Sequence, residues 1–278
     1  MGHLQLGKHR LDLTYPRVMG IVNVTPDSFS DGGRYFNAQR ALAHARRLVA
    51  DGADIVDVGG ESTRPGALPV SEVEELERIL PLVETLANDG VLVSVDTMKA
   101  AVMRPAIVAG AVMINDVGAL QESAAMEAIA ATDVAICLMH MQGAPRTMQA
   151  DPQYADVVHE VRDFLVARAQ ACEAAGIAHN RIAIDPGFGF GKTVAHNLAL
   201  LRGLPALAAA GYPVIAGLSR KNTIGRITGR EVGDRLAGSL AAALAAVARG
   251  AAIVRVHDVR ETVDALKVWR AVEGEGEA

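Results

Sequence analysis

The chain has 278 residues; half of them are hydrophobic, 21% are charged and only 4% are aromatic. This composition can bury a large core, and it excludes an intrinsically disordered chain. Because 27 Lys and Arg face 32 Asp and Glu, the formal net charge is −5, and we expect neither nucleic acid nor a membrane surface as a partner. An anionic substrate would therefore have to bind to a local cluster of cations.

Three features of the sequence predict a soluble protein of the cytoplasm. The longest uncharged apolar run covers residues 236–248 and is too short to span a bilayer. The N-terminus has no apolar stretch of the kind found in secretory signals. The two cysteines, Cys137 and Cys172, are too few for a disulfide framework, and Cys137 lies within an apolar run, which fits a reducing compartment.

Short apolar runs recur along the chain, and each one ends in polar residues. Continuous rather than alternating hydrophobicity indicates strands that are buried on both faces, as in a parallel sheet. The eight strands predicted in this way cover residues 18–22, 55–58, 91–95, 112–114, 134–139, 182–184, 214–218 and 253–254. Ahead of them, apolar and polar residues alternate on both sides of Gly7 and Lys8, which predicts a hairpin within residues 1–14.

Segments with a helical period separate the predicted strands. The apolar face of the first two is marked by Leu42, Ala45 and Val49, and by Leu76, Ile79, Leu80 and Val83. Ser71 and Glu74 have the spacing of a capping box and predict the start of the second helix. Pro81 predicts a kink in that helix or an earlier end.

A glycine follows six of the helical segments, where it can adopt the left-handed conformation that ends a helix. These glycines are Gly52, Gly90, Gly110, Gly176, Gly211 and Gly250. Eight strand-plus-helix units predict an α/β fold, a TIM (β/α)8 barrel, as a single domain over residues 1–278. The hairpin would close the bottom of the barrel, and residues 273–278 would form a frayed tail. An open doubly wound sheet is the alternative, but the turn at residues 23–26 lacks its glycine fingerprint.

In a TIM barrel, ligands bind where the strands end at their C-termini. The polar residues expected to meet there are Asn23, Thr63, Arg64, Asp96, Asn115, Asp185, Lys221, Arg255 and His257. Any one of them could merely cap a buried strand, but so many buried polar groups together need partners or a ligand. The acceptors suit a flat heterocycle with several N–H donors, and the cations suit phosphate or carboxylate groups. We therefore predict a site for a polar heterocycle beside an anion.

Two loops at this end and one rejected motif refine the prediction. The loop at residues 25–33 contains Phe29 and is expected to be a lid, whereas glycines in the loop at residues 59–66 allow a close approach to a ligand. Residues 187–193 nearly match a phosphate-binding P-loop, but Pro186 replaces its first glycine, and we reject a nucleoside triphosphatase. The histidines lack zinc-site spacing, whereas a hard cation such as Mg²⁺ is compatible with the oxygen ligands available.

Eight motifs, in order along residues 18–266, resemble those of the dihydropteroate synthase family. They are NVTPDSFSDGG at 23–33, DVGGESTRPG at 57–66, SVDT at 94–97, IND at 114–116, LMHMQG at 138–143, DPGFGFGK at 185–192, SRK at 219–221 and RVHDV at 255–259. The resemblance implies a barrel that condenses 6-hydroxymethyl-7,8-dihydropterin diphosphate with 4-aminobenzoate. The products are 7,8-dihydropteroate and diphosphate, in the step of folate synthesis that sulfonamides inhibit.

The resemblance also implies roles for individual residues, bound Mg²⁺ and a homodimer. The pterin would contact Asp96, Asn115, Asp185, Met139, Gly217, Lys221 and the face of Arg255. The diphosphate would contact Thr63, Arg255 and His257, and Asn23 would help to bind Mg²⁺. The aminobenzoate would lie among Arg64, Pro65, Phe29, Phe190 and Asn222. We expect Lys221, Arg255 and Asp31 to be catalytic, with Asp31 facing a pterin methylene cation that forms as diphosphate leaves.

One departure and two alternatives remain. Many family members have Ser where this chain has Asn222, which leaves the side-chain contact with the aminobenzoate carboxylate open. A pterin-binding methyltransferase acting on methyltetrahydrofolate would need no diphosphate site, so Thr63, Arg64, Lys221 and His257 argue against it. A non-catalytic pterin-binding protein would not need a lid with Phe29 and Asp31.

Overall fold

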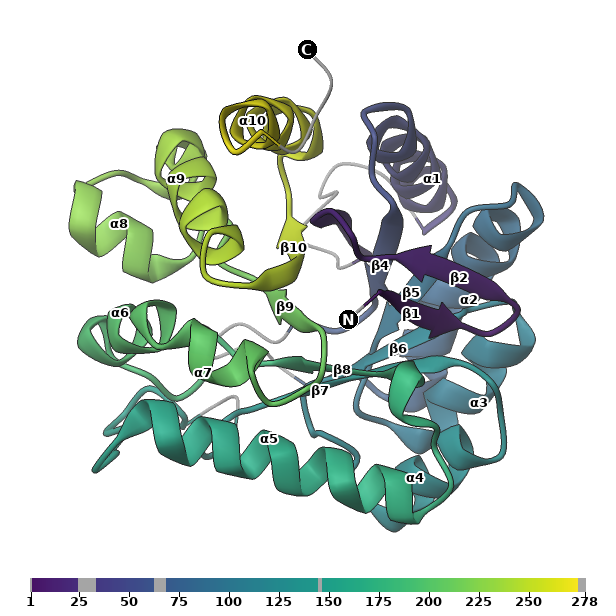
Figure 1. The fold of residues 1–278 in the computed structure, drawn as a ribbon. Coiled ribbons are helices and arrows are strands. Elements are labelled where there is room, and N and C mark those ends of the chain that lie inside the picture. Colours follow the sequence, from purple (N-terminus) through teal and green to yellow (C-terminus); the bar gives the residue numbers. More distant parts are fainter. Residues whose placement is uncertain (1, 25–33, 63–68, 145–146, 275–278) are drawn as a thin grey trace.

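The computed structural model describes residues 2–24, 34–62, 69–144 and 147–274. Eight parallel strands close into a barrel in the order β10-β3-β4-β5-β6-β7-β8-β9, with helices around it (Figure 1). The barrel strands are β3 Arg17–Asn23, β4 Ile55–Gly59, β5 Val93–Asp96, β6 Met113–Asp116, β7 Ala135–Met139, β8 Ile182–Asp185, β9 Val214–Ala216 and β10 Ala251–Val256. The TIM barrel and all eight predicted strands are thereby confirmed.

The helices form the outer layer of the barrel (Figure 1). They are α1 Arg34–Ala50, α2 Glu72–Asn88, α3 Ala100–Val108, α4 Ser123–Ala130, α5 Val157–Ala174, α6 Val194–Arg202, α7 Leu204–Ala208, α8 Asn222–Thr228, α9 Leu236–Val247 and α10 Val259–Val272, with short 3₁₀ helices η2 His179–Arg181 and η3 Val232–Asp234. All six glycines predicted to end helices have positive φ, between 80° and 106°. The chain thus leaves each of these helices through a left-handed residue.

An antiparallel hairpin lies across the N-terminal end of the barrel (Figure 1). Its strands, β1 His3–Leu6 and β2 His9–Asp12, pair around Gly7 and Lys8 as predicted. Leu4 and Leu6 are fully buried in a cluster with inward-facing strand residues such as Met19 and Ile55. The hairpin therefore plugs the barrel from below and leaves the C-terminal ends of the strands for ligands.

The structure bears on two predicted details of the helices. In α1, Ala45 is buried and Leu42 packs against the core as predicted, whereas Val49 is 37% exposed and Leu48 lies in the core instead. Helix α2 continues through Pro81 to Asn88, so the earlier end is wrong. Pro81 lies on the exposed face of that helix.

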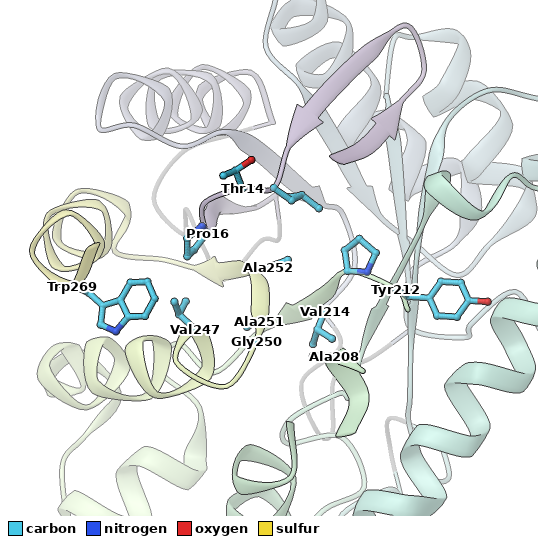
Figure 2. Close-up of a pocket in the computed structure, with 12 residues that line it drawn as sticks. Thr14, Pro16, Ala208, Tyr212, Val214, Val247, Gly250, Ala251, Ala252 and Trp269 are labelled. Atoms are coloured by element: carbon cyan, nitrogen blue, oxygen red, sulfur yellow. The ribbon is translucent and has the colours of Figure 1, made fainter. Parts of the chain in front are cut away.

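A pocket of about 330 Å³ lies beside the N-terminal ends of β9 and β10 (Figure 2). Trp269 of α10 and Tyr212 lie on opposite sides of it, and the described residues that line it carry no charged side chain. Such a lining offers an anion no positively charged side chain, which directs attention to the other end of the barrel. No helix within the described part of the chain is long and apolar enough to cross a membrane.

Candidate active site

The register of neighbouring strands aligns the predicted polar residues across the C-terminal end of the barrel. Asn23 on β3 pairs with Gly59 on β4, Gly59 with Asp96 on β5, and Asp96 with Asn115 on β6. A Cβ atom at Gly59 would lie 3.7 Å from Asn23 Oδ1 and 3.9 Å from Asp96 Oδ2. Because Gly59 has no side chain, the space between these two side-chain oxygens stays open.

Arg255 of β10 reaches across the barrel to this row. Its Nε donates to Asp57 Oδ2 at 2.6 Å and its Nη2 donates to Asp96 Oδ2 at 2.8 Å. Asn115 Nδ2 donates to the same Asp57 oxygen at 3.1 Å. Asp57 is fully buried, so this carboxylate anchors both the cation and the amide of the site.

Burial and the neighbouring charges shift the pKa values of this cluster in opposite directions. Burial raises the pKa of Asp96 to about 7, although Arg255 opposes the rise. For Arg255 burial lowers the pKa, but Asp57 and Asp96 raise it by more, and the guanidinium stays charged. Asp57 Oδ1 and Asp96 Oδ1 are buried and have no hydrogen-bond partner among the described residues. These two oxygens are available to the N–H groups of a ligand.

A second cluster lies on β8 and in the segments that follow β8 and β9. Asp185 Oδ1 accepts from the Gly187 N–H at 2.7 Å, and Lys221 Nζ donates to the Phe188 carbonyl. The same ammonium lies 4.7 Å from the centre of the Phe190 ring, a cation–π contact. Burial raises the pKa of Asp185 and lowers that of Lys221 to about 8, and each charge opposes the shift of the other. Asp185 and Lys221 thus form a partly compensated pair.

Gly217, which follows β9, joins the two clusters. A Cβ atom there would lie 3.8 Å from Asp185 Oδ2 and 3.9 Å from both Arg255 Cβ and Lys221 Nζ. Met139 at the end of β7 pairs in register with Asp185 and is 4% exposed. The fold therefore brings the predicted pterin-contacting residues to one end of the barrel, around a space that no side chain of Gly217 fills.

His257 and Asn222 lie at the edge of this group. Ser219 Oγ accepts from the His257 backbone N–H at 3.2 Å and lies 3.0 Å from its Nδ1. The Ser219 hydroxyl thus holds both the backbone and the ring of His257 in place. Lys221 caps α8, and Asn222 is the first residue of that helix.

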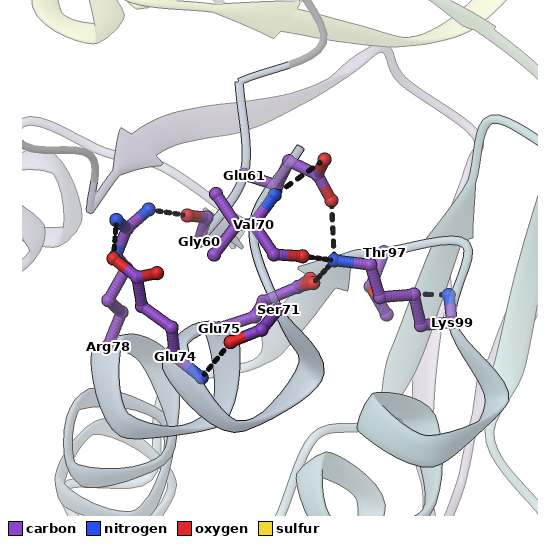
Figure 3. A network of polar contacts seen from close by, with 9 residues as sticks. All are labelled: Gly60, Glu61, Val70, Ser71, Glu74, Glu75, Arg78, Thr97 and Lys99. Carbon is purple, nitrogen blue, oxygen red and sulfur yellow. Dashed lines mark hydrogen bonds and ion pairs between the residues drawn. The ribbon is translucent and has the colours of Figure 1, made fainter. Parts of the chain in front are cut away.

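The loop between β4 and α2 is anchored at both of its ends (Figure 3). Lys99 Nζ donates to Glu61 Oε2 and Glu75 Oε2, both at 2.7 Å, and to the Val70 carbonyl at 2.6 Å. Glu61 Oε1 in turn accepts from the Val70 N–H at 3.3 Å. Arg78 of α2 donates to the Gly60 carbonyl at 2.7 Å. These contacts hold together the residues that enter and leave the loop.

Five predicted site residues lie outside the described residues: Phe29, Asp31, Thr63, Arg64 and Pro65. Other functional residues were missed by the sequence analysis, although Asp57 had a signal, since a carboxylate inside the apolar run 55–58 requires a buried partner. Lys192 was quoted in the rejected phosphate-loop match and in the family motif at residues 185–192, but it was given no role in the site. It is 3% exposed and donates to backbone carbonyls, which is incompatible with a phosphate cradle and supports the rejection.

Comparisons with known proteins agree with this geometry. Residues 19–257 match the family described as pterin binding enzyme. The chain is 55% identical over 275 residues to the dihydropteroate synthase of Neisseria meningitidis serogroup B, covering 96% of each chain. It is 54% identical to a Xanthomonas albilineans dihydropteroate synthase solved with 4-aminobenzoic acid, at a TM-score of 0.93 and 98% coverage of both chains.

A Burkholderia cenocepacia dihydropteroate synthase complexed with 7,8-dihydropteroate is 49% identical, with a TM-score of 0.89 and coverage of 98% of this chain and 97% of that one. Identity of this extent, over nearly the whole length, accompanies the same fold. The chain therefore belongs to the pterin binding enzyme family and, within it, to the dihydropteroate synthases.

Proposed function

We propose that the chain condenses 6-hydroxymethyl-7,8-dihydropterin diphosphate with 4-aminobenzoate, and that it does so with Mg²⁺ and the residues described above. The observation that carries the proposal is the meeting of Asp96, Asn115 and Asp185 with Lys221 and Arg255 at the open end of the barrel. The solved relatives with bound 4-aminobenzoic acid and 7,8-dihydropteroate support the choice of substrate and product.

The pterin binds over the buried carboxylates. Asp96 Oδ1 has no partner among the described residues, and Asp185 Oδ2 faces the space beside Gly217, so both can accept ring N–H donors. Asn115 is held by Asp57 and adds an amide, while Met139 and Lys221 complete the pocket. Arg255 lies against the ring face, its guanidinium held by two carboxylates.

The anionic groups bind toward the loops. Arg255, His257 and Thr63 contact the diphosphate, and the Ser219 hydroxyl holds the His257 ring that would face it. Arg64, Pro65, Phe29, Phe190 and Asn222 surround the aminobenzoate. The Phe190 ring, in contact with the Lys221 ammonium, offers an apolar face for the benzene ring.

The reaction begins with departure of the leaving group, because an arylamine is a weak nucleophile. The bond between the pterin methylene carbon and the diphosphate oxygen breaks, and the electron pair leaves with the oxygen. Lys221 and Arg255 are positioned beforehand, so their charges need no reorganisation as charge separates. Asp31 faces the resulting cation, the aminobenzoate nitrogen bonds to the methylene carbon and loses a proton, and closed loops exclude water.

Mg²⁺ suits the side-chain oxygen at the end of β3. Asn23 supplies an amide oxygen there, in register with Gly59 and next to the row that continues with Asp96. Hard-oxygen ligands of this kind, together with substrate phosphates, are what Mg²⁺ prefers. When bound, the ion would supply positive charge to the diphosphate oxygens, and Asn23 would be its ligand from the chain.

One assay tests the proposal. The protein is incubated with the dihydropterin diphosphate and labelled 4-aminobenzoate, with either Mg²⁺ or EDTA. We expect labelled dihydropteroate only with Mg²⁺. No product in either condition would overturn the activity, and equal product in both would overturn the metal dependence. The alternative methyltransferase is not favoured, because proteins similar over nearly the whole chain are dihydropteroate synthases.

The homodimer is likewise a proposal. Ile227 of α8, Val232 of η3 and Leu236 at the start of α9 are 58%, 49% and 37% exposed and lie on consecutive elements of the chain. Burying such residues against a second copy would be favourable. Sedimentation should give twice the 29.1 kDa of one chain, and Ile227→Asp should shift it toward the monomer. A wild-type monomer at micromolar concentration would contradict the proposal.

A further inference from the structure

Every backbone carbonyl in the glycine-rich segment Gly187–Gly191 is capped by a side chain. The donors are Lys192 for Gly187 at 3.0 Å, Lys221 for Phe188, Gln149 for Gly189, Lys192 for Phe190 at 2.9 Å and Tyr154 for Gly191 at 2.8 Å. Such consecutive capping is absent from an ordinary surface loop, whose carbonyls bind water. The segment, here called the β8 loop, is therefore held in one conformation by surrounding donors.

Lys192 is the centre of this arrangement. Besides two carbonyls of the β8 loop, its Nζ lies 2.9 Å from His140 Nδ1 and 3.3 Å from the His140 carbonyl, just after β7. Burial and the neighbouring Lys192 charge lower the pKa of His140 to about 3, so the imidazole is neutral and accepts at Nδ1. One ammonium thus joins the β8 loop to the end of the adjacent strand.

Two glycines make this junction possible. A Cβ atom at Gly187 would lie 1.9 Å from the His140 carbonyl oxygen, and one at Gly191 would lie 2.4 Å from that of Gln142. Both glycines also have positive φ, at 65° and 61°. The two loops therefore meet backbone to backbone, at a distance that only glycine allows.

The β8 loop in turn holds the ammonium of Lys221. The Phe188 carbonyl accepts from Lys221 Nζ, and the Phe190 ring lies beneath it at 4.7 Å. Lys192 caps the carbonyls on either side of Phe188, at Gly187 and at Phe190. Loss of the Lys192 hydrogen bonds would therefore free the backbone around Phe188, whose carbonyl holds Lys221.

We propose that Lys192 is a positioning residue for the reaction: its buried amine clamps the β8 loop onto the end of β7 and so places Phe188, Phe190 and Lys221 for the substrates. The inference rests on the proposed function, which it deepens. The local sequence mimics a phosphate-binding loop, but the lysine turns into its own loop and binds peptide oxygens in place of phosphate oxygens. Lys192 itself touches no substrate.

The test compares Lys192→Met with Lys267→Met. Methionine keeps the length and apolar stem of lysine but donates no hydrogen bond, and Lys267 is a 71% exposed lysine of α10 that serves as a matched control. Hydrogen exchange of the ligand-free proteins measures the Gly187 and Phe190 amides, which bond to Asp185 and Gly187. Steady-state kinetics then gives kcat and the KM for each substrate.

For Lys192→Met we expect exchange at these amides to be at least tenfold faster, the aminobenzoate KM to rise at least tenfold and kcat to fall. Affinity for a plain pterin should fall less than the affinity for aminobenzoate, because Asp96 and Asn115 bind the pterin without the β8 loop, whereas Lys221 depends on that loop. Mere loss of folded protein would lower kcat alone and leave KM unchanged, and that result would overturn the inference. Wild-type exchange and wild-type kinetics in the variant would also overturn it, as would altered exchange with unaltered kinetics.

A second variant covers the case in which Lys192→Met does not fold. Tyr154→Phe removes the cap of the Gly191 carbonyl and retains the ring, and the aminobenzoate KM should rise two- to fivefold with faster exchange at Phe190. No change in either would overturn the idea that carbonyl capping places the loop. If the wild-type chain forms no dihydropteroate, the proposed function fails, whereas the exchange measurements still decide whether Lys192 clamps the loop.

Discussion

Two lysines, the half-buried Lys99 and the buried Lys192, hold two loops of the active-site end, and they do so with different partners. Lys99 binds the residues that flank the β4–α2 loop through two carboxylates and one carbonyl (Figure 3). Lys192 binds the β8 loop through carbonyls and a neutral imidazole. Both amines have enough acceptors for their three protons, but only Lys99 has nearby negative charge in direct contact.

This difference decides the charge of each amine. For Lys99 burial lowers the pKa, but the hydrogen bonds that it donates to Glu61 and Glu75 raise the pKa by more, so the net shift is upward. For Lys192 burial lowers the pKa to about 7, with partial opposition from Asp185 and a further lowering by Lys221. The two lysines thus differ in two ways that act in the same direction: Lys192 is more deeply buried, and only Lys99 contacts carboxylates that favour the charged amine.

The largest expected effect is on stability. Lys99→Met leaves Glu75, which is 1% exposed, as a buried carboxylate without its cation, and this should cost about 3–5 kcal/mol. Lys192→Met leaves neutral carbonyls without a donor, at about 1–3 kcal/mol, and also removes a poorly solvated charge. Denaturant unfolding at neutral pH should therefore rank Lys99→Met as the less stable variant.

The double variant Lys99→Met with Glu75→Gln is the control for this ranking. Neutralising the stranded carboxylate should recover part of the loss caused by Lys99→Met alone. If the two single variants are equally stable, or if Glu75→Gln brings no recovery, the carboxylate partners of Lys99 do not account for the difference between the loops.

The next largest effect is expected on pterin affinity, from a change at Asp185. The Asp185 carboxylate opposes the lowering of the Lys192 and Lys221 pKa values by burial. In Asp185→Asn an amide replaces a carboxylate that accepts from ring N–H donors, and a charge-assisted hydrogen bond contributes about 1.5–3 kcal/mol. Pterin affinity, measured by calorimetry, should fall tenfold or more. The circular dichroism spectrum should stay unchanged, and an unaltered affinity would remove Asp185 from the pterin site.

The barrel and the position of its site follow from local sequence patterns. Strands buried on both faces have continuous apolar runs, and six helices end at a glycine, so the eight units and their order could be predicted. Because parallel strands present their C-terminal ends at one face, Asp96, Asn115 and Asp185 could be placed together without coordinates.

The supporting contacts could not be predicted in the same way. Lys99 and Glu75 are 24 residues apart, and Lys192 and His140 are 52 apart, so no periodicity links them. The main partners of Lys192 are peptide carbonyls, which every residue has and no pattern reveals. The helical period predicted Val49 instead of Leu48 on the buried face of α1, because this spacing alone fits two neighbouring stripes of the helix almost equally well.

The pH dependence of stability should separate the two lysines. Lys192 has a folded pKa of about 7 against 10.5 for the ordinary lysine, so between these values the unfolded chain binds a proton that the folded chain does not. Stability from this group therefore rises with pH across that window, by at most about 1.4 kcal/mol per pH unit, and is constant below it.

Lys99 gives the opposite expectation. Its folded pKa is raised above the ordinary value, so its contribution is fully present below 10.5 and is lost only as pH rises through the folded pKa. The difference in unfolding free energy between wild type and Lys192→Met should grow in favour of wild type from about pH 7 to about pH 9. The corresponding difference for Lys99→Met should stay flat, and parallel pH profiles for the two variants would contradict the assignment of charge.

The smallest effect is expected in the segment after β9, to which neither Lys99 nor Lys192 donates a hydrogen bond directly. Asn222 begins α8 directly after Lys221, so its backbone N–H is one of the unpaired donors of the first helical turn. We expect the aminobenzoate carboxylate to bind mainly to that N–H, which Ser would present equally well. Asn222→Ser should therefore change the aminobenzoate KM by less than about fivefold, within about 1 kcal/mol, and leave kcat nearly unchanged. A collapse of kcat in this variant would mean that the Asn222 side chain itself binds the carboxylate, and that a segment outside both lysine-held loops controls the aminobenzoate site.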